Sequence, residues 1–237
     1  MKSDFFYLQQ CRLLHAKSPH KIGTDAVMLG AFTQHDTPLR ILDIGTGTGI
    51  IAVMMAQKYP TASIDALDIC KDAYNEASEN FENTPWNSRL NCYLQDAYSF
   101  CCQTSTSYDI IVSNPPFFHN SLLSKKTEKN NARHSLSLSP ETIIDAAASC
   151  ISQKGIFSVI IPYSDIHRYC VYAQSHQLFL IHSLVISPFA NSEPNRGILI
   201  FSPTYKAFSK DFLWIYNDDN TYSEKHTALT KPFLTHF

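Results

Sequence analysis

The chain has 237 residues, of which 44% are hydrophobic and 17% are charged, which fits one large globular domain, alone or with a small appendage. Its 19 basic and 21 acidic residues nearly cancel, which excludes a global basic field, so a nucleic-acid partner would be bound by a local patch. Seven cysteines without a CxxC pair and a polar N-terminus favour reduced thiols in a soluble cytoplasmic protein. No apolar run approaches the roughly 20 residues of a membrane span.

Strand-like and helix-like segments alternate from about residue 40 to residue 202, which predicts a Rossmann-like α/β fold with a mostly parallel sheet covered by helices on both faces. The expected strands are the seven segments 40–44, 63–68, 90–94, 108–113, 156–162, 178–187 and 196–202. The expected helices are residues 48–59, 71–81 and 140–149, the last opened by Ser139 as its N-cap. We expect one domain, residues 1–237, in which residues 1–35 extend over the active-site side and residues 204–237 form a C-terminal strand and tail.

A glycine-rich segment, Asp43-Ile44-Gly45-Thr46-Gly47-Thr48-Gly49, lies where the first expected strand ends and a helix begins. Glycines there permit positive φ angles and close approach of a ligand, while the start of the helix offers free N–H groups. The third glycine comes one residue earlier than in the dinucleotide-binding GxGxxG pattern. This spacing favours a site for S-adenosylmethionine, the alternative being an ordinary tight turn.

Two carboxylates follow the next two expected strands. Asp68 ends the segment 63–68, where it can accept hydrogen bonds from both hydroxyls of a ribose. Asp96 follows the segment 90–94, where it can accept one from the amino group of an adenine. Taken singly, each carboxylate is equally well a solvated residue at a strand end, but together with the glycine segment they predict one nucleoside site.

The expected strand 108–113 runs directly into Asn114, Pro115, Pro116 and Phe117. An exocyclic amino group of adenine is a poor nucleophile because its lone pair is delocalised into the ring. The Asn114 side-chain oxygen and the Pro115 carbonyl can accept hydrogen bonds from that amine, which favours the tetrahedral nitrogen formed as it attacks. The prolines fix the backbone, and Phe117 offers a ring on which a base can stack. The alternative is a strand-ending turn with Phe117 in the core.

These segments resemble a known family. The segments that carry the resemblance are HKIGTDAVMLGA (20–31), LDIGTGTGIIAVMMAQ (42–57), TPWNSRL (84–90), YDIIVSNPPFF (108–118), NAR (131–133), NRGILIFSP (195–203) and YSEKHTALTKPFL (222–234). With them the chain resembles the class I S-adenosylmethionine-dependent methyltransferases with an Asn-Pro-Pro-aromatic motif, and more narrowly the bacterial tRNA1(Val) (adenine37-N6)-methyltransferase family. The glycine and Asn-Pro-Pro motifs identify the chemistry, whereas KIGTD, TPW and the YSE…ALT tail are specific to the family.

The resemblance implies methyl transfer from S-adenosylmethionine to N6 of adenine 37 in the anticodon loop of tRNA1(Val). Separately, we expect a monomer and no metal. The implied cofactor-binding residues are Lys21, Gly23, Thr24, Asp43, Gly45, Thr46, Gly47, Gly49, Asp68, Ile69, Asp96, Ala97 and Asn114. The implied catalytic residues are Asn114, Pro115, Pro116 and Phe117. Two departures stand out: the aromatic residue after the prolines is often Tyr in the family, and the run LLHAKSPHK before the KIGTD segment lacks the usual arginine and methionine.

The expected RNA contacts rest on local charge. The candidates are Lys125, Lys126, Lys129 and Arg133, in the long polar segment after the Asn-Pro-Pro motif, and Arg196. Each has an alternative: a charged loop is usually solvated, and Arg196 suits a structural ion pair. Three other functions stay open, namely methylation of an amino group in ribosomal RNA, methylation of a protein glutamine, and a catalytically silent RNA-binding module.

Overall fold

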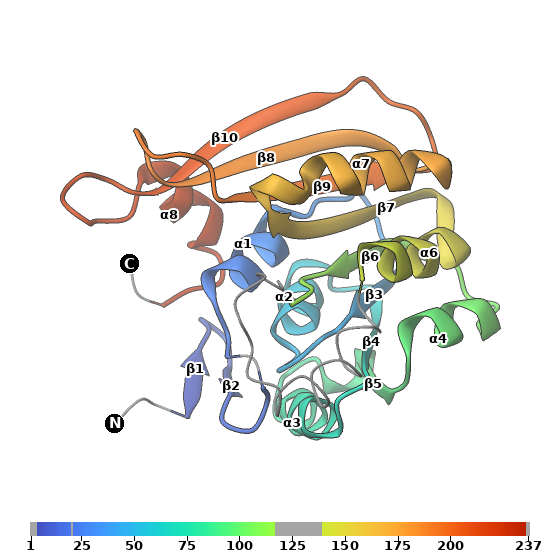
Figure 1. Ribbon diagram of the computed structural model, residues 1–237. Coiled ribbons are helices and arrows are strands. Elements are labelled where there is room, and N and C mark those ends of the chain that lie inside the picture. Colours follow the sequence, from blue (N-terminus) through green and yellow to red (C-terminus); the bar gives the residue numbers. More distant parts are fainter. Residues whose placement is uncertain (1–3, 20, 117–138, 236–237) are drawn as a thin grey trace, which may run out of the picture.

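The computed structural model describes residues 4–19, 21–116 and 139–235 (Figure 1). The phenylalanine and the basic loop residues expected to act between 117 and 133 therefore lie outside the described residues. The described strands are β1 (Phe5–Tyr7), β2 (Arg12–Leu14), β3 (Arg40–Ile44), β4 (Ser63–Asp68), β5 (Leu90–Leu94), β6 (Tyr108–Ser113), β7 (Ile151–Pro162), β8 (Phe179–Phe189), β9 (Arg196–Ser202) and β10 (Ser209–Tyr216). The described helices are α1 (Thr24–Phe32), α2 (Ile50–Lys58), α3 (Lys71–Glu82), α4 (Ala97–Gln103), α6 (Pro140–Cys150), α7 (Ile166–Ser175) and α8 (Glu224–Thr230), with short 3-10 turns at Asn87–Arg89 and Tyr163–Asp165.

One twisted sheet organises the molecule, with the strand order β10-β8-β9-β7-β6-β3-β4-β5. Strands β5, β4, β3, β6 and β7 run parallel to one another, and β9 lies antiparallel between β7 and β8. The predicted fold class is therefore confirmed. The expected number of seven strands is too low for the described residues, because β10 pairs with β8 as an eighth strand at the edge.

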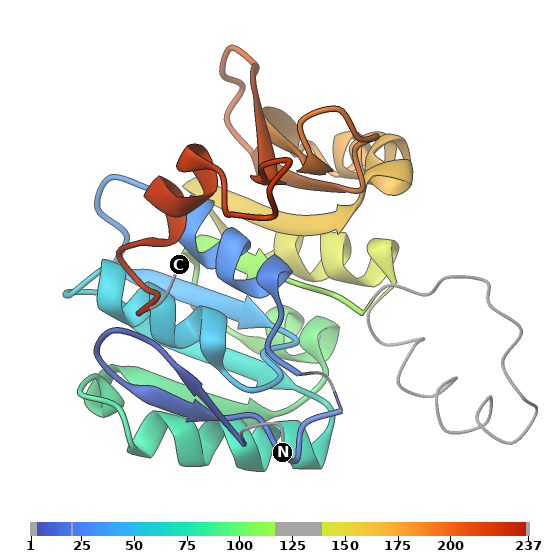
Figure 2. The same ribbon diagram turned by 90° about the vertical axis from the view of Figure 1, so that its left-hand side faces the viewer.

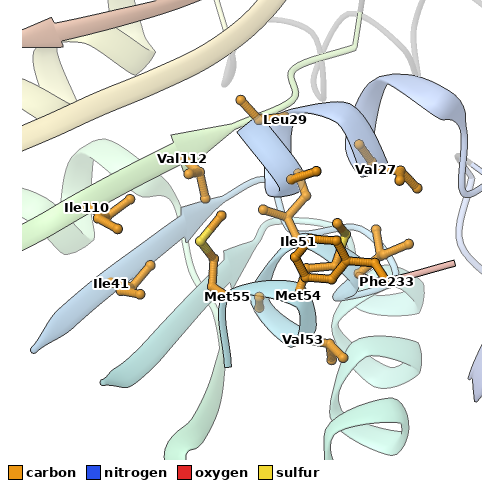
Figure 3. Close-up of a cluster of buried hydrophobic side chains, with 14 of the residues drawn as sticks. Val27, Leu29, Ile41, Ile51, Val53, Met54, Met55, Ile110, Val112 and Phe233 are labelled. Atoms are coloured by element: carbon orange, nitrogen blue, oxygen red, sulfur yellow. The ribbon is translucent and has the colours of Figure 1, made fainter. Parts of the chain in front are cut away.

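The two faces of the sheet follow from the alternation of side chains along each strand. On β3, Ile41 packs in a cluster with α1, α2 and α3, while Leu42 and Ile44 pack in a second cluster with α4, α6 and α7. Figure 3 shows side chains of α1 and α2, among them Leu29 and Met55, gathered over Ile41 and the neighbouring residues of β6. Both faces are covered, as predicted, and Asp43 falls on the face of α2.

Several boundaries differ from the expected ones. Strand β7 begins at Ile151, five residues before the expected 156, and α2 begins at Ile50 because Gly49, in the left-handed region, is its N-cap. At α6 the prediction is confirmed, since the Ser139 side chain accepts a hydrogen bond from the Thr142 N–H at 3.2 Å.

Segments from both ends of the chain pack against this core. The β1–β2 hairpin lies beside α3, on the lower side of the molecule in Figure 2, and is joined to it by hydrogen bonds between Leu14 and Asn80. The two terminal segments meet where the Gln9 N–H donates to the Phe233 carbonyl at 2.8 Å. Within the described parts of the chain, no helix has both the length and the apolar character needed to cross a membrane.

Candidate active site

The glycine-rich loop joins β3 to α2 and depends on three residues in the left-handed region. Gly45, Gly47 and Gly49 have φ angles of 72°, 59° and 84°, which residues with a Cβ rarely adopt. A Cβ on Gly49 would also lie 2.5 Å from the ring of Phe81 in α3. Gly45 and Thr46 both donate their N–H groups to the Leu67 carbonyl at 2.9 Å, which fixes the loop against the end of β4.

Asp43 is buried beneath this loop. One carboxylate oxygen, Oδ2, accepts hydrogen bonds from the Thr46 hydroxyl at 2.7 Å and from the Ala52 N–H in the first turn of α2 at 3.2 Å. Its second oxygen, Oδ1, is buried and has no hydrogen-bond partner among the described residues. Burial raises the pKa of Asp43 from 3.8 to about 7, against the lowering effect of its two donors. The site thus holds an acceptor that a cationic ligand group would stabilise.

The carboxylate of Asp68, at the end of β4, connects the loop after β3 with the residues that follow β4. It accepts from the Gly47 N–H at 2.9 Å and, through its other oxygen, from the Cys70 N–H at 2.8 Å. A small hollow opens at this point. It is lined by Gly45, Leu67, Asp68, Ile69, Gln95, Asp96 and Ala97. Five of the residues predicted to bind the cofactor therefore meet in one place.

The far end of that hollow is formed by the start of α4. Asp96 is the N-cap of this helix, and its Oδ1 accepts from the Ser99 N–H at 2.9 Å. The cap orients the carboxyl group and leaves its other oxygen for a donor. Beside it, Ile69 exposes 39% of its surface, and with the buried Ala97 and Leu67 it gives the hollow an apolar wall suited to a flat base.

Asn114 lies next to the glycine loop because β6 pairs with β3. Ser113 pairs with Ile44 and donates its hydroxyl to the Ile44 carbonyl at 2.9 Å, so Asn114 follows at the level of Gly45. Asn114 is half-buried, and its side chain forms no hydrogen bond within the described residues. Pro115 is buried and Pro116 is half-buried, which anchors the backbone after the strand. An amide and a fixed carbonyl thus stand at the carboxyl edge of the sheet, where ligands of such folds bind.

The segment before α1 lies near the same edge of the sheet, but the three residues predicted to bind the cofactor there have different surroundings. Lys21 donates from Nζ to the carbonyls of His15 and Ala16, which folds the segment back on itself. Gly23 is the N-cap of α1, and Thr24, its first residue, is exposed. These contacts do not place any of the three predicted residues in the hollow, and their contact with a cofactor stays a prediction.

Arg196, one of the residues predicted to bind RNA, forms an ion pair. Its Nε donates to Asp25 Oδ2 in the first turn of α1 at 2.8 Å, and both side chains are about three-quarters buried. Because Arg196 pairs with Pro162 at the end of β7, this ion pair lies at the same edge of the sheet as Asn114. A structural role is established for Arg196, and an additional RNA contact stays a prediction.

Two buried polar residues near the loop were missed from the sequence. Glu76, in α3, is fully buried, and its carboxylate accepts from the Lys17 N–H at 2.5 Å and from the Ser18 N–H at 3.2 Å. Ser18 is 4% exposed and lies over Gly47. No local pattern marks Ser18, whereas the position of Glu76 on the apolar face of the expected helix 71–81 was a signal of a buried carboxylate.

Comparison with known proteins identifies the family. The model of the methyltransferase small domain family matches residues 18–163. A tRNA1(Val) (adenine(37)-N6)-methyltransferase of Flavobacterium psychrophilum is 38% identical over 229 residues, covering 96% of this chain and 98% of the relative. The chain belongs to the family of the tRNA1(Val) (adenine(37)-N6)-methyltransferases. Relatives of the same name in Phocaeicola vulgatus and Proteus mirabilis are 38% and 32% identical, with at least 96% of each chain covered.

Solved structures of more distant methyltransferases share the fold. A predicted O-methyltransferase from Agrobacterium tumefaciens has a TM-score of 0.69 at 14% identity, covering 88% of this chain and 96% of that one. The ribosomal protein L11 methylase of Lactobacillus delbrueckii subsp. bulgaricus has a TM-score of 0.51 at 18% identity, covering 74% and 75%. At such identities the likeness concerns the class I methyltransferase fold alone.

Proposed function

We propose that this methyltransferase transfers a methyl group from S-adenosylmethionine to N6 of adenine 37 in the anticodon loop of tRNA1(Val). Relatives of that name at 31 to 38% identity over nearly the whole chain support the substrate. The observation that carries the chemistry is the pairing of β6 with β3, which sets Asn114 beside the glycine loop. We place the reaction in the cytoplasm, where tRNA is found.

The residues present fit this cofactor. Adenine suits the apolar wall of Ile69 and Ala97 beside Asp96, and the ribose hydroxyls suit Asp68. The buried Asp43 Oδ1, which has no hydrogen-bond partner among the described residues, suits a cationic ammonium group, because an acceptor without a donor costs about 1 to 3 kcal/mol in a protein interior. When bound, S-adenosylmethionine supplies an electrophilic methyl group on its sulfonium.

The protein's own contribution is to hold the target amine. The Asn114 side-chain oxygen and the Pro115 carbonyl accept the two hydrogens of the amino group, which directs the nitrogen lone pair out of the ring plane. Pro115 and Pro116 keep these acceptors in place because their φ angles are fixed. The methylated ammonium product is acidic, so its proton passes to water without a side-chain base. Phe117, a stacking partner for the base in this proposal, lies outside the described residues.

Binding of tRNA requires a local basic surface because the whole chain carries a formal net charge of −2. We assign this to Lys125, Lys126, Lys129 and Arg133, with Arg196 at the mouth of the site. Replacing the four loop residues by Glu is expected to abolish salt-dependent tRNA binding while the affinity for cofactor is kept.

Nucleoside analysis tests the proposal. Unmodified total tRNA is incubated with the purified protein and isotopically labelled S-adenosylmethionine, and the tRNA nucleosides are analysed by mass spectrometry. We expect labelled N6-methyladenosine in tRNA1(Val) at adenine 37, and its formation at least about 100-fold slower with the Asn114→Ala protein. Label that appears instead in ribosomal RNA or in a protein glutamine would refute the substrate and leave the amine chemistry standing. Absence of cofactor binding would refute the proposal altogether.

A further inference from the structure

Ser18 presents a buried hydroxyl at the glycine-rich loop. Its side chain is 4% exposed, and its Oγ has no hydrogen-bond partner among the described residues. A Cβ built on Gly47 would lie 3.9 Å from this oxygen and would meet no other described atom within 4 Å. Apart from the neighbours of Gly47 in the chain, this hydroxyl is therefore the described group that faces the loop where Gly47 lacks a side chain.

The position of Ser18 is fixed by the fold. Glu76 accepts the Ser18 N–H at 3.2 Å, and the neighbouring Asn80 donates from Nδ2 to the carbonyls of Leu14 and Thr48 at 2.9 and 2.8 Å. Helix α3 thus joins the segment before α1 to the glycine loop. A buried hydroxyl at such a fixed position normally has a hydrogen-bond partner within the protein, because a buried hydroxyl without one is unfavourable.

We propose that the Ser18 hydroxyl donates a hydrogen bond to the α-carboxylate of the amino-acid part of S-adenosylmethionine. This inference rests on the proposed function and deepens it. Adenine at Asp96 and ribose at Asp68 direct the rest of the ligand toward Gly47, whose N–H already contacts Asp68 at 2.9 Å. At that end of the site the described residues offer two partnerless buried atoms, the acceptor Asp43 Oδ1 and the Ser18 hydroxyl. A zwitterion of ammonium and carboxylate matches an acceptor and a donor.

The test compares two ligands that differ by one group. Calorimetry measures the Kd of S-adenosylmethionine and of its decarboxylated counterpart, which keeps the adenosine, sulfonium and amine. We expect the wild-type protein to prefer S-adenosylmethionine, and Ser18→Ala to reduce this preference by about 10-fold or more, the effect of one hydrogen bond to a charged group. Ser18→Cys, which keeps a side chain of similar size but donates weakly, is expected to lose the preference as well.

Ser202→Ala is the matched control. Ser202 is also a buried serine, but its hydroxyl donates to the Gly155 carbonyl at 3.0 Å, far along the sheet from the loop. We expect this variant to melt at a lower temperature with an unchanged preference, and Ser18→Ala to melt at or above the temperature of the wild type, because it removes a buried hydroxyl without a partner among the described residues. An unchanged preference in Ser18→Ala, an equal loss for both ligands, or a wild type without preference would each overturn the inference. A wild type that binds neither ligand would instead refute the proposed function.

Discussion

Replacing Asp43 by asparagine should make the ligand-free protein more stable at alkaline pH. Burial raises the pKa of this carboxyl from 3.8 to about 7, so the folded state binds its proton more tightly than the unfolded state does. The free energy of unfolding of the wild type therefore falls as pH rises through this range, by about 1.4 kcal/mol per pH unit. Over roughly three pH units the loss approaches about 4 kcal/mol, and the Asp43→Asn protein escapes it because an amide does not ionise.

The structure also indicates why the substitution is tolerated. An amide oxygen can keep the hydrogen bonds from Thr46 and Ala52, and the amide nitrogen takes the place of the carboxylate oxygen that has no partner among the described residues. The same change removes the negative charge proposed to stabilise the cofactor's ammonium group. Affinity for S-adenosylhomocysteine should therefore fall at least about 10-fold while stability rises.

Urea unfolding at a series of pH values from 4.5 to 8 measures the first effect. The difference in free energy of unfolding between Asp43→Asn and the wild type should grow by about 3 kcal/mol across the series and then level off above pH 7. Asp218→Asn, in an exposed turn, makes the same change of net charge and should show no such growth. A difference that stays constant with pH, or an Asp43→Asn protein that is less stable than the wild type at pH 8, would refute the reasoning.

Three further predictions concern other parts of the site. Asn114→Ala should lower kcat about 100- to 1,000-fold with little change in cofactor affinity, and a normal rate in single-turnover assays would exclude its role. Arg196→Ala and Asp25→Ala both break the ion pair between these residues, but only Arg196→Ala also removes the positive charge proposed to contact tRNA. Only Arg196→Ala should therefore weaken tRNA binding in filter assays, and equal losses in the two variants would leave Arg196 with a structural role alone. Gly49→Ala, at a φ of 84° and against an aromatic ring, should cost about 2 to 5 kcal/mol of stability, whereas Gly23→Ala, where a Cβ meets nothing within 4 Å, should cost little in the same denaturation experiment.

The sheet could be predicted because its central strands are buried on both faces. Runs such as that of β6 are continuous in apolar, β-branched residues and end at turn residues, so their limits show in the sequence. Strand β10 lies within residues 204–237, where a C-terminal strand was expected, but it was not counted among the seven strands of the sheet. It lies at the sheet edge, with its first four residues exposed and only Leu213 buried. Helix α1 was not predicted for the opposite reason: six successive residues are buried, and no polar face marks a helical period.

The residues of the site likewise divide into those whose position could be predicted from the sequence and those whose position could not. Gly45, Asp68 and Asp96 could be placed because strand ends of a parallel sheet share an edge, so residues 20 or more apart in sequence are brought together by the fold class alone. Ser18 and Arg196 could not be placed so, because their surroundings come from α3 and α1, whose docking the sequence pattern does not specify. The prediction succeeds where topology decides position and fails where side-chain packing does.

The polar atoms around the glycine loop link stability to function. Asp43 and Ser18 each bury an oxygen without a partner among the described residues, and Asp43 in addition carries a carboxyl that burial pushes toward its neutral form. Neither arrangement helps the protein fold, since apolar residues of similar size would cost less. Both become favourable when a zwitterionic ligand supplies an ammonium donor and a carboxylate acceptor. The protein should therefore be stabilised by its cofactor by more than the contacts of adenine and ribose alone provide, and both substitutions should reduce that stabilisation.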